Sequence, residues 1–252
     1  MSDDLHGKTA LVTGAAKRIG AAISLALARE GANVILHYRG SADQAERLRD
    51  EIVALGVRSW LVRADFEKPQ EYETLVERSI EAAGGLDMLV NNASFFPADS
   101  LSTIRFEDLV RSMEVNAWVP FVLSRDFARL AGRGKIVNLV DSRTHDFDWA
   151  HVGYILSKHV LDVLTRVTAL KYAPNITVNG VAPGLILPPP GEDESYLQRL
   201  THTVPLKRHG SPEDIAETVV YLMKSDFVTG EIIAVDGGRR LKEYESGPRP
   251  DK

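Results

Sequence analysis

Residues 9–20 read Thr-Ala-Leu-Val-Thr-Gly-Ala-Ala-Lys-Arg-Ile-Gly, a short apolar run followed by a turn with two glycines. Gly14 lets the chain turn tightly where the run ends, and Gly20 lets the following helix approach the sheet closely. The N-terminus of such a helix presents free backbone N–H groups, which bind phosphate. The segment therefore predicts the strand, turn and helix that bind the pyrophosphate of a dinucleotide; an ordinary turn without a ligand is the alternative.

Short apolar runs alternate with longer amphipathic segments along the rest of the chain. We expect strands at 9–12, 33–37, 57–63, 86–91, 135–140, 176–181 and 232–235. We expect helices at about 19–30, 42–55, 71–83, 103–114, 117–130, 152–172 and 212–223. Strands that alternate with helices favour right-handed crossovers and a mostly parallel sheet with helices on both faces.

The prediction is one α/β domain of the doubly wound Rossmann type with seven strands, spanning residues 1–240. Residues of about 185–205 contain a proline-rich stretch and interrupt the alternation. Long loops inside compact α/β domains are usually lids or binding loops, so we expect a substrate loop there. The polar segment 241–252 is expected to be a flexible tail.

The composition of the 252-residue chain excludes several kinds of site and partner. No cysteine is present, which excludes disulfides, thiolate metal sites and thiol nucleophiles. The net charge of −5, with acids and bases mixed, argues against a nucleic-acid partner. The acidic N-terminus lacks a signal-peptide pattern and no apolar run spans a bilayer, so we expect a cytoplasmic protein without membrane contact. We expect no metal, because these histidines lack metal-ligand spacing with acids: His145, His151, His159, His202 and His209.

The end of the second strand indicates which dinucleotide binds. Residues 37–41 read His-Tyr-Arg-Gly-Ser and contain no acid, whereas NAD-binding chains usually place Asp or Glu here to accept from the ribose 2′-OH. Arg39 and Ser41, with Lys17 and Arg18 across the first turn, would instead bind a 2′-phosphate. One charge-assisted bond is worth roughly 1.5–3 kcal/mol, which gives about one to two decades of preference for NADPH. A solvated basic patch is the alternative.

Two residues four positions apart, Tyr154 and Lys158, share one face of the helix expected at 152–172. A tyrosine with a pKa of about 10 needs roughly 4 kcal/mol of anion stabilisation to exchange a proton near neutral pH. A lysine ammonium about 5 Å away supplies about 3 kcal/mol at an effective dielectric constant of about 20. The positive nicotinamide ring would supply the rest, so we predict that Tyr154 carries the proton of a redox reaction.

Polar residues also follow the third and fourth expected strands. Asp65 closes the third strand, where it would accept from the adenine amino group or cap a helix. Residues 91–93, Asn-Asn-Ala, end the fourth strand at the carboxyl edge, where such sheets bind ligands. Asn116 would hold a water that relays protons to the lysine, or would simply cap a helix.

Together these motifs resemble the short-chain dehydrogenase/reductase family over essentially the whole chain. The motifs are residues 13–14, 91–93, Asn116, Tyr154 with Lys158, 181–184 and 235–238. The resemblance implies that Tyr154 is the acid/base, that Lys158 binds the nicotinamide ribose and that Asn116 completes the relay. It also implies a homotetramer formed through the two long helices and the last strand. The cofactor-binding residues expected are Gly14, Arg18, Ile19, Gly20, Tyr38, Arg39, Ser41, Asp65, Asn92, Ala93, Tyr154, Lys158, Pro183 and Gly184.

The chain departs from the family pattern at two positions, and at both it resembles the pteridine reductase branch of the family. That branch includes bacterial dihydromonapterin and dihydrofolate reductases. Arg18 replaces the middle glycine of the first loop, and Asp141 replaces the catalytic serine thirteen residues before the tyrosine. In that branch the residue matching Arg18 touches cofactor phosphate and pterin. The resemblance further implies that Ser94 contacts substrate, that Phe96 stacks the pterin against nicotinamide, and that Asp141 works beside Tyr154.

The carboxylate at Asp141 bears on the reaction. An ionised carboxylate disfavours a neighbouring tyrosinate and opposes Lys158, so the pair with Tyr154 titrates together. That suits delivery of a proton to a ring nitrogen while hydride reduces a C=N bond. Two alternatives stay open: Ser142 could face the tyrosine in place of Asp141, and Phe96 could be an ordinary core residue.

The leading hypothesis is an NADPH-dependent reductase of a dihydropterin or dihydrofolate ring. A second is a carbonyl reductase of the same family that acts on a 3-oxoacyl thioester, a sugar or a quinone-like substrate. A third is a non-catalytic NADPH sensor. In each case the partner is a small molecule, and Trp149 and the segment 185–205 are expected to line its pocket.

Overall fold

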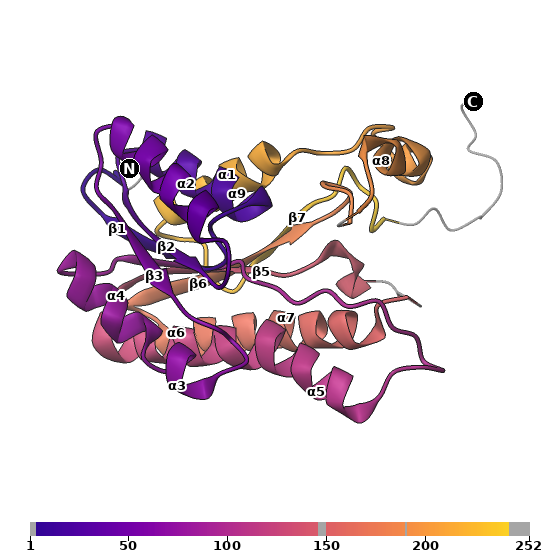
Figure 1. Ribbon diagram of the computed structural model, residues 1–252, viewed down its shortest axis with the longest axis horizontal. Coiled ribbons are helices and arrows are strands. Elements are labelled where there is room, and N and C mark those ends of the chain that lie inside the picture. Colours follow the sequence, from indigo (N-terminus) through magenta and orange to yellow (C-terminus); the bar gives the residue numbers. More distant parts are fainter. Residues whose placement is uncertain (1–3, 146–149, 190, 242–252) are drawn as a thin grey trace.

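A parallel sheet of seven strands lies at the centre of the computed structural model, which describes residues 4–145, 150–189 and 191–241 (Figure 1). Trp149 and residues 242–252 of the expected tail 241–252 lie outside the described residues. The strands are β1 (Thr9–Val12), β2 (Asn33–Tyr38), β3 (Ser59–Arg63), β4 (Met88–Asn91), β5 (Gly134–Leu139), β6 (Ile176–Pro183) and β7 (Ile232–Val235).

The strand order is β3-β2-β1-β4-β5-β6-β7, and every neighbouring pair is parallel. Leu11 in β1 lies opposite Ile35 in β2 and Leu89 in β4. The chain reverses its direction of winding between β1 and β4. In open α/β sheets, ligands bind outside the carboxyl ends of the strands at this point.

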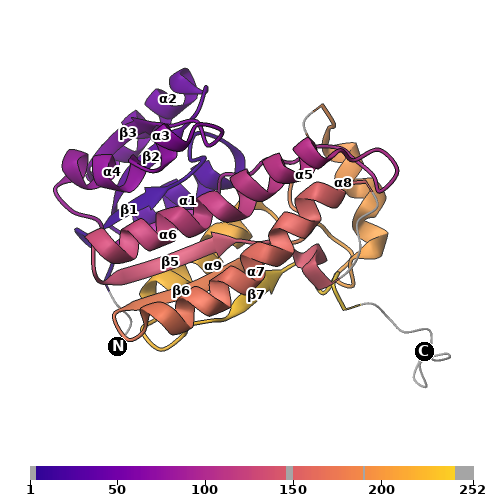
Figure 2. The ribbon, with the colours of Figure 1, turned by 90° about the horizontal axis from the view of Figure 1, so that it is seen from below.

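Helices cover both faces of the sheet. They are α1 (Arg18–Arg29), α2 (Ala42–Ala54), α3 (Pro69–Tyr72), α4 (Leu75–Ala83), α5 (Phe106–Met113), α6 (Val119–Leu130), α7 (Val152–Tyr172), α8 (Glu194–Leu200) and α9 (Pro212–Lys224). Figure 1 shows α1, α2 and α9 on one side and α3 to α7 on the other, and Figure 2 shows the second layer face on. The expected doubly wound α/β fold is therefore confirmed.

Side chains of one strand alternate between two hydrophobic cores. Ala10 and Val12 pack in the cluster that contains buried residues of α1 and α9. Leu11 and Ile35 belong to the other cluster, with residues of α4, α6 and α7. Burial on both faces explains why these strands read as continuous apolar runs in the sequence.

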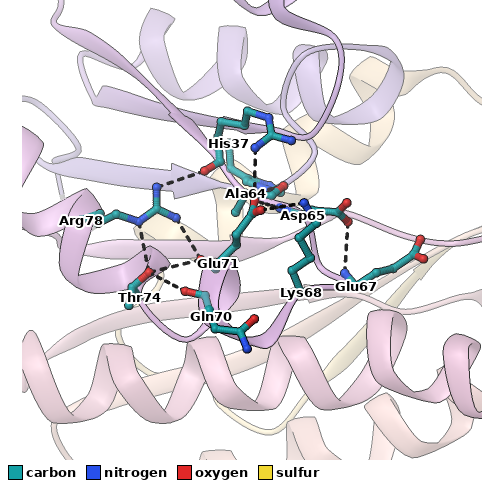
Figure 3. A network of polar contacts seen from close by, with 10 residues as sticks. His37, Ala64, Asp65, Glu67, Lys68, Gln70, Glu71, Thr74 and Arg78 are labelled. Atoms are coloured by element: carbon teal, nitrogen blue, oxygen red, sulfur yellow. Dashed lines mark hydrogen bonds and ion pairs between the residues drawn. The ribbon is translucent and has the colours of Figure 1, made fainter.

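The helix expected at 71–83 is divided into α3 and α4. The hydroxyl group of Thr74, between the two, donates to the carbonyl oxygen of Gln70 at 3.1 Å. The Arg78 guanidinium donates to the carbonyl oxygen of Glu71 at 2.9 Å (Figure 3). A continuous helix would pair that carbonyl with the amide four residues on, so side-chain hydrogen bonds replace the missing helical ones.

The helix expected at 103–114 begins at Phe106 and continues through a π-helical turn, Glu114–Trp118, into α6. Pro120 in the first turn of α6 lacks a backbone N–H, so the carbonyl of Asn116 has no partner four residues on. The wider turn accommodates this loss, and π-turns are frequent at functional sites. The other expected elements differ from the observed bounds by at most two residues at either end.

The segment 185–205 contains α8 and a short 3₁₀ turn, Thr201–Thr203. The carboxylate of Asp193 accepts from the backbone N–H of Ser195 at 2.9 Å and caps α8. No helix among the described residues is long and apolar enough to cross a membrane.

Candidate active site

The first turn of the chain joins the ends of three strands. The backbone N–H of Gly14, which has a positive φ of 62°, donates to Nδ1 of His37 at 3.0 Å. The hydroxyl oxygen of Thr13 accepts from the backbone N–H groups of Asn92 and Ala93 at 2.9 and 3.0 Å. These bonds fix the ends of β1, β2 and β4 around the point where the winding reverses.

His37 lies in the site and makes contacts that the sequence did not indicate. Its Nε2 lies 3.0 Å from the carbonyl oxygen of Ala64, and its ring stacks on Phe66 at a centroid distance of 4.5 Å. Burial lowers the pKa of His37 to about 4. Because Nδ1 faces a donor, the neutral tautomer carries its proton on Nε2, and the ring holds the glycine turn as an acceptor.

The start of α1 fits a pyrophosphate. A Cβ atom on Gly20 would lie 2.7 Å from Nδ2 of Asn92, so only glycine permits this approach to the turn. Among the described residues, no side chain caps the N-terminus of α1, and such free N–H groups bind anions. Arg18 has a positive φ of 57°, and its guanidinium donates to the carbonyl oxygen of Pro188 at 2.7 Å. The first turn is therefore tied to the segment 185–205.

An acid that the sequence analysis missed lies beside Arg39. The guanidinium of Arg39 pairs with the Glu67 carboxylate at 3.1 Å, and that carboxylate also pairs with Arg111 at 2.6 Å. Arg111 in turn lies 4.2 Å over the ring of Phe95. A cofactor phosphate at Arg39 would therefore compete with Glu67 for the guanidinium.

Asp65 lies in the neighbouring network after β3 (Figure 3). Its Oδ1 accepts from the backbone N–H of Glu67 at 3.1 Å, and its own N–H donates to the Glu71 carboxylate at 2.8 Å. Asp65 therefore acts as a turn acceptor in this network, and it is one of the residues that line the cavity of the site.

The tyrosine and the carboxylate at the catalytic end are in direct contact. The Tyr154 hydroxyl group donates to Oδ2 of Asp141 at 2.9 Å. Tyr154 lies in the first turn of α7, and Asp141 follows the carboxyl end of β5. Asp141, rather than Ser142, is thus the residue hydrogen-bonded to the phenol.

Arg143, which the sequence did not indicate, binds the carboxylate of Asp141 through two nitrogen atoms. Its Nε donates to Oδ1 of Asp141 at 3.0 Å, and its Nη2 donates to Oδ2 at 2.9 Å. The guanidinium carbon lies 5.4 Å from the ring centroid of Phe96 and 5.5 Å from that of Tyr154. The carboxylate therefore sits between a cation and the phenol.

The pKa of Tyr154 is not lowered towards neutrality as the pairing with Lys158 predicted. Burial, followed by the charge of Asp141, raises the pKa of Tyr154 well above its ordinary value. Lys158 lies with its Nζ 5.6 Å from the Tyr154 ring centroid and donates to the carbonyl oxygen of Leu139 at 2.6 Å. Burial of the phenol, which a sequence does not show, disfavours its anion.

The other two charges of this cluster are also perturbed. Burial lowers the pKa of Lys158 to about 8, although Asp141 acts in the opposite direction. Burial alone would raise the pKa of Asp141, but the hydrogen bonds and charge of Arg143 more than offset it and lower that pKa. The resting cluster therefore holds an ionised carboxylate and a protonated phenol.

Asn116 uses its whole amide group to position neighbouring segments. Its Oδ1 accepts from the Phe95 backbone N–H at 2.7 Å and from the Ser94 hydroxyl at 3.1 Å. Its Nδ2 donates to the Phe95 carbonyl oxygen at 2.8 Å and to the Ser157 hydroxyl at 3.0 Å. Asn116 thus fixes the segment after β4 against α7.

Phe96 lies at the substrate side of the cluster. Its ring stacks on His151 at a centroid distance of 4.1 Å and is perpendicular to the ring of Tyr154 at a centroid distance of 4.6 Å. With 38% of its surface exposed, Phe96 is not an ordinary core residue, whereas Phe95 packs against a hydrophobic core cluster. His151 is another contact that the sequence analysis missed.

These residues enclose a cavity of about 630 Å³. The predicted site residues on its wall are Gly14, Arg18, Ile19, Gly20, Arg39, Asp65, Asn92, Ala93, Ser94, Phe96, Asp141, Tyr154 and Gly184. The predicted residues that do not line it are Tyr38, Ser41, Asn116, Lys158 and Pro183. Within the described chain, no cluster of His, Asp and Glu could hold a metal ion.

Comparison with known proteins gives matches along nearly the whole chain. The family model described as Enoyl-(Acyl carrier protein) reductase matches residues 14–240. The short chain dehydrogenase mdpC of Emericella nidulans is 34% identical over 93% of this chain and 96% of its own. The 3-oxoacyl-(acyl-carrier-protein) reductase FabG of Staphylococcus epidermidis is 34% identical over 92% and 98%. The crystal structure of FolM alternative dihydrofolate reductase 1 from Brucella canis, complexed with NADP, has a TM-score of 0.88 and 33% identity, and covers 99% of both chains.

Proposed function

The chain belongs to the short-chain dehydrogenase/reductase family, and we propose that it reduces a pterin-type substrate, a dihydropterin, dihydromonapterin or dihydrofolate, to the tetrahydro form. It is an oxidoreductase, and its cofactor is NADP(H). The observation that carries the pterin proposal is the 2.9 Å hydrogen bond from the Tyr154 phenol to the carboxylate of Asp141. A serine at that position would polarise a carbonyl oxygen, whereas a carboxylate beside the phenol suits proton delivery to a nitrogen.

The residues around the first turn fit the cofactor. The approach that Gly20 permits and the uncapped N-terminus of α1 suit a pyrophosphate. Lys17, Arg18 and Arg39 line the same cavity and supply cations for the 2′-phosphate. Lys158, predicted to bind the nicotinamide ribose, donates to the Leu139 carbonyl oxygen and has two further N–H donors for a ribose hydroxyl group.

Bound NADPH supplies the hydride that is added to the carbon of the substrate C=N bond. Tyr154 holds the proton that the ring nitrogen takes up, and Asp141 orients the hydroxyl group through Oδ2. The phenol becomes negative as the proton leaves. Two cations near its ring, Arg143 and Lys158, offset that charge at 5.5 and 5.6 Å from the ring centroid.

The substrate side of the cavity supports a flat heteroaromatic ring. Phe96 presents a partly exposed aromatic surface beside Tyr154, and Ser94 presents a hydroxyl group oriented by Asn116. The FolM structure of Brucella canis, an alternative dihydrofolate reductase by its name, has the same overall fold at 33% identity. These observations favour a pterin over a flexible acyl chain.

The second candidate is a carbonyl reductase that acts on a 3-oxoacyl, sugar or quinone-like substrate. Its support is the 34% identity to FabG, which is named a 3-oxoacyl reductase. The Asp141–Tyr154 contact counts against it, because Asp141 is an acceptor and cannot polarise a carbonyl oxygen while ionised. A non-catalytic sensor would have no use for this buried contact.

Consumption of NADPH by the purified protein, measured against matched panels of dihydropterins, dihydrofolate and simple ketones or 3-oxoacyl thioesters, tests the proposal. We expect turnover with at least one dihydropterin, and at least tenfold less with Asp141→Ser. Ready reduction of carbonyl substrates with no turnover of any dihydropterin would refute the proposal. Asp108→Ser, an exposed carboxylate on α5, is the matched control.

We infer that the protein forms the homotetramer that the family resemblance implies. The exposed apolar residues on one stripe of α7 are Leu156, Val160, Val163, Val167 and Leu170. They recur every three or four positions, as a helix-packing face requires. Figure 2 shows that α7 lies beside α5 and α6 in one helical layer. Light scattering should give a tetramer for the native chain and smaller species for Val163→Glu; a native monomer would contradict the inference.

A further inference from the structure

The contacts around Asp141 define its charge state without reference to any ligand. Its Oδ1 accepts from the Arg143 backbone N–H at 2.8 Å and from Arg143 Nε at 3.0 Å. Its Oδ2 accepts from Arg143 Nη2 at 2.9 Å and from the Tyr154 hydroxyl at 2.9 Å. A guanidinium and a backbone amide can only donate, so a proton on Oδ1 would face two donors. The geometry therefore fits an ionised carboxylate.

The same contacts place the transferable proton on Tyr154. An ionised Asp141 accepts at Oδ2, so the phenol must be the donor of that hydrogen bond. Without Arg143, one proton shared between the carboxylate and the phenol could reside on either group, since such pairs titrate together. Because Arg143 donates to both oxygens of Asp141, the shared proton resides on Tyr154.

The charged and titratable groups that face Asp141 come from two elements in the described chain. Arg143 belongs to the 3₁₀ turn Ser142–His145, and Tyr154 and Lys158 belong to α7. Lys158 directs its Nζ to the carbonyl oxygen of Leu139, so Arg143 is the cation in direct contact with the carboxylate. The Arg143 side chain is 30% exposed and lines the cavity, whereas that of Asp141 is 11% exposed.

We propose that Arg143 is a positioning residue that holds Asp141 as an ionised acceptor and so makes Tyr154 the proton donor of the reaction. The two hydrogen bonds from Arg143 stabilise the ionised form of the carboxylate and also orient it, because a guanidinium binds both oxygens in one plane. The role rests on the proposed reductase activity, but not on which substrate is reduced. It makes Arg143 necessary for the proton step without contact with the reacting atoms.

The first test is the pH dependence of kcat for the native enzyme, Arg143→Gln and Arg143→Lys, at saturating NADPH. Activity should fall as pH drops and Asp141 takes up a proton. An opposite charge within contact distance lowers a carboxyl pKa by about 1–3 units. The pH at which kcat falls on the acidic side of the profile, its acidic limb, should therefore rise by at least about one unit in Arg143→Gln. Arg143→Lys should recover part of the shift, and added guanidinium ion should recover part of it in Arg143→Gln. The dissociation constant for NADPH should stay within about twofold.

A merely structural role for Arg143 would lower kcat at every pH and leave the limb in place. That result, or higher activity of Arg143→Gln at low pH, would overturn the proposal; the second outcome would make Asp141 the donor. Arg105→Gln, an exposed arginine paired with Glu107 and Asp108, is the matched control and should leave the profile unchanged.

A second measurement needs no substrate and separates failure of this inference from failure of the proposed function. The carboxyl ¹³C resonance of Asp141, assigned with Asp141→Asn, is titrated in the native protein and in Arg143→Gln. The carboxyl pKa should rise by at least about one unit in the variant. Equal values in the two proteins would overturn the inference even if dihydropterin turnover is observed.

Discussion

Acidification should weaken the fold through His37, the buried ring that accepts from the Gly14 backbone N–H. The pKa of His37 is lowered from 6.5 to about 4, so the unfolded chain binds more protons than the folded one between these values. Stability that is fully present above pH 6.5 is therefore lost as pH falls towards about 4. A gap of about 2.5 pKa units corresponds to about 3 kcal/mol, a large share of a typical folding free energy.

Urea unfolding at about pH 7.5 and about pH 4.5 measures this loss in the cofactor-free protein. The native chain should lose about 2–3 kcal/mol more than His37→Gln, whose amide group can accept and donate but does not titrate in this range. His202→Gln, at an exposed histidine, controls for general acid effects. Equal losses in the native chain and His37→Gln would refute the assignment of His37 as a neutral anchor of the first turn.

Three further predictions concern the cofactor end and Lys158. Gly20→Ala should cost about 1–3 kcal/mol and weaken NADPH binding, as measured by unfolding and fluorescence titration; Gly85→Ala, where an added Cβ meets nothing within 4 Å, should do neither. Glu67→Gln releases Arg39 from an exposed ion pair, so KM for NADPH should fall by about two- to fivefold with little change for NADH; an unchanged ratio of the two would be contrary evidence. Because the pKa of Lys158 is lowered from 10.5 to about 8, the unfolded chain binds the extra proton between these values and stability should rise with pH across them. The rise should be about 3 kcal/mol and absent from Lys158→Met, and urea unfolding of both proteins over that range decides it.

Local sequence signals predicted the parts of the fold and site that depend on neighbouring residues. β1, β7 and α7 begin and end where the pattern placed them, because apolar periodicity and turn residues act over a few positions. The contact between Asp141 and Tyr154 was predicted because Asp141 lies thirteen residues before the tyrosine, where the family has its catalytic serine. The glycine turn was predicted because a tight turn with a positive φ at Gly14 favours glycine.

The parts that the sequence did not predict depend on residues far apart in the chain. His37 meets Gly14 across 23 positions, and Arg39 meets Glu67 across 28, so no local pattern indicates either contact. Arg143 was missed for a different reason, since its importance depends on a carboxylate whose orientation only the folded loop defines. The raised pKa of Tyr154 in the chain without cofactor was not predicted, because a sequence shows charge but not burial.

Single-turnover reduction by Tyr154→Phe tests the central claim most directly. The enzyme with bound NADPH is mixed rapidly with the dihydropterin that the native protein turns over fastest, and NADPH absorbance is followed. If the Tyr154 phenol supplies the proton, the variant should bind NADPH with an unchanged dissociation constant and lose at least about a hundredfold in the rate of oxidation. A variant that oxidises NADPH at the native rate would contradict the account, because the phenol held by Asp141 would then have no part in the chemistry.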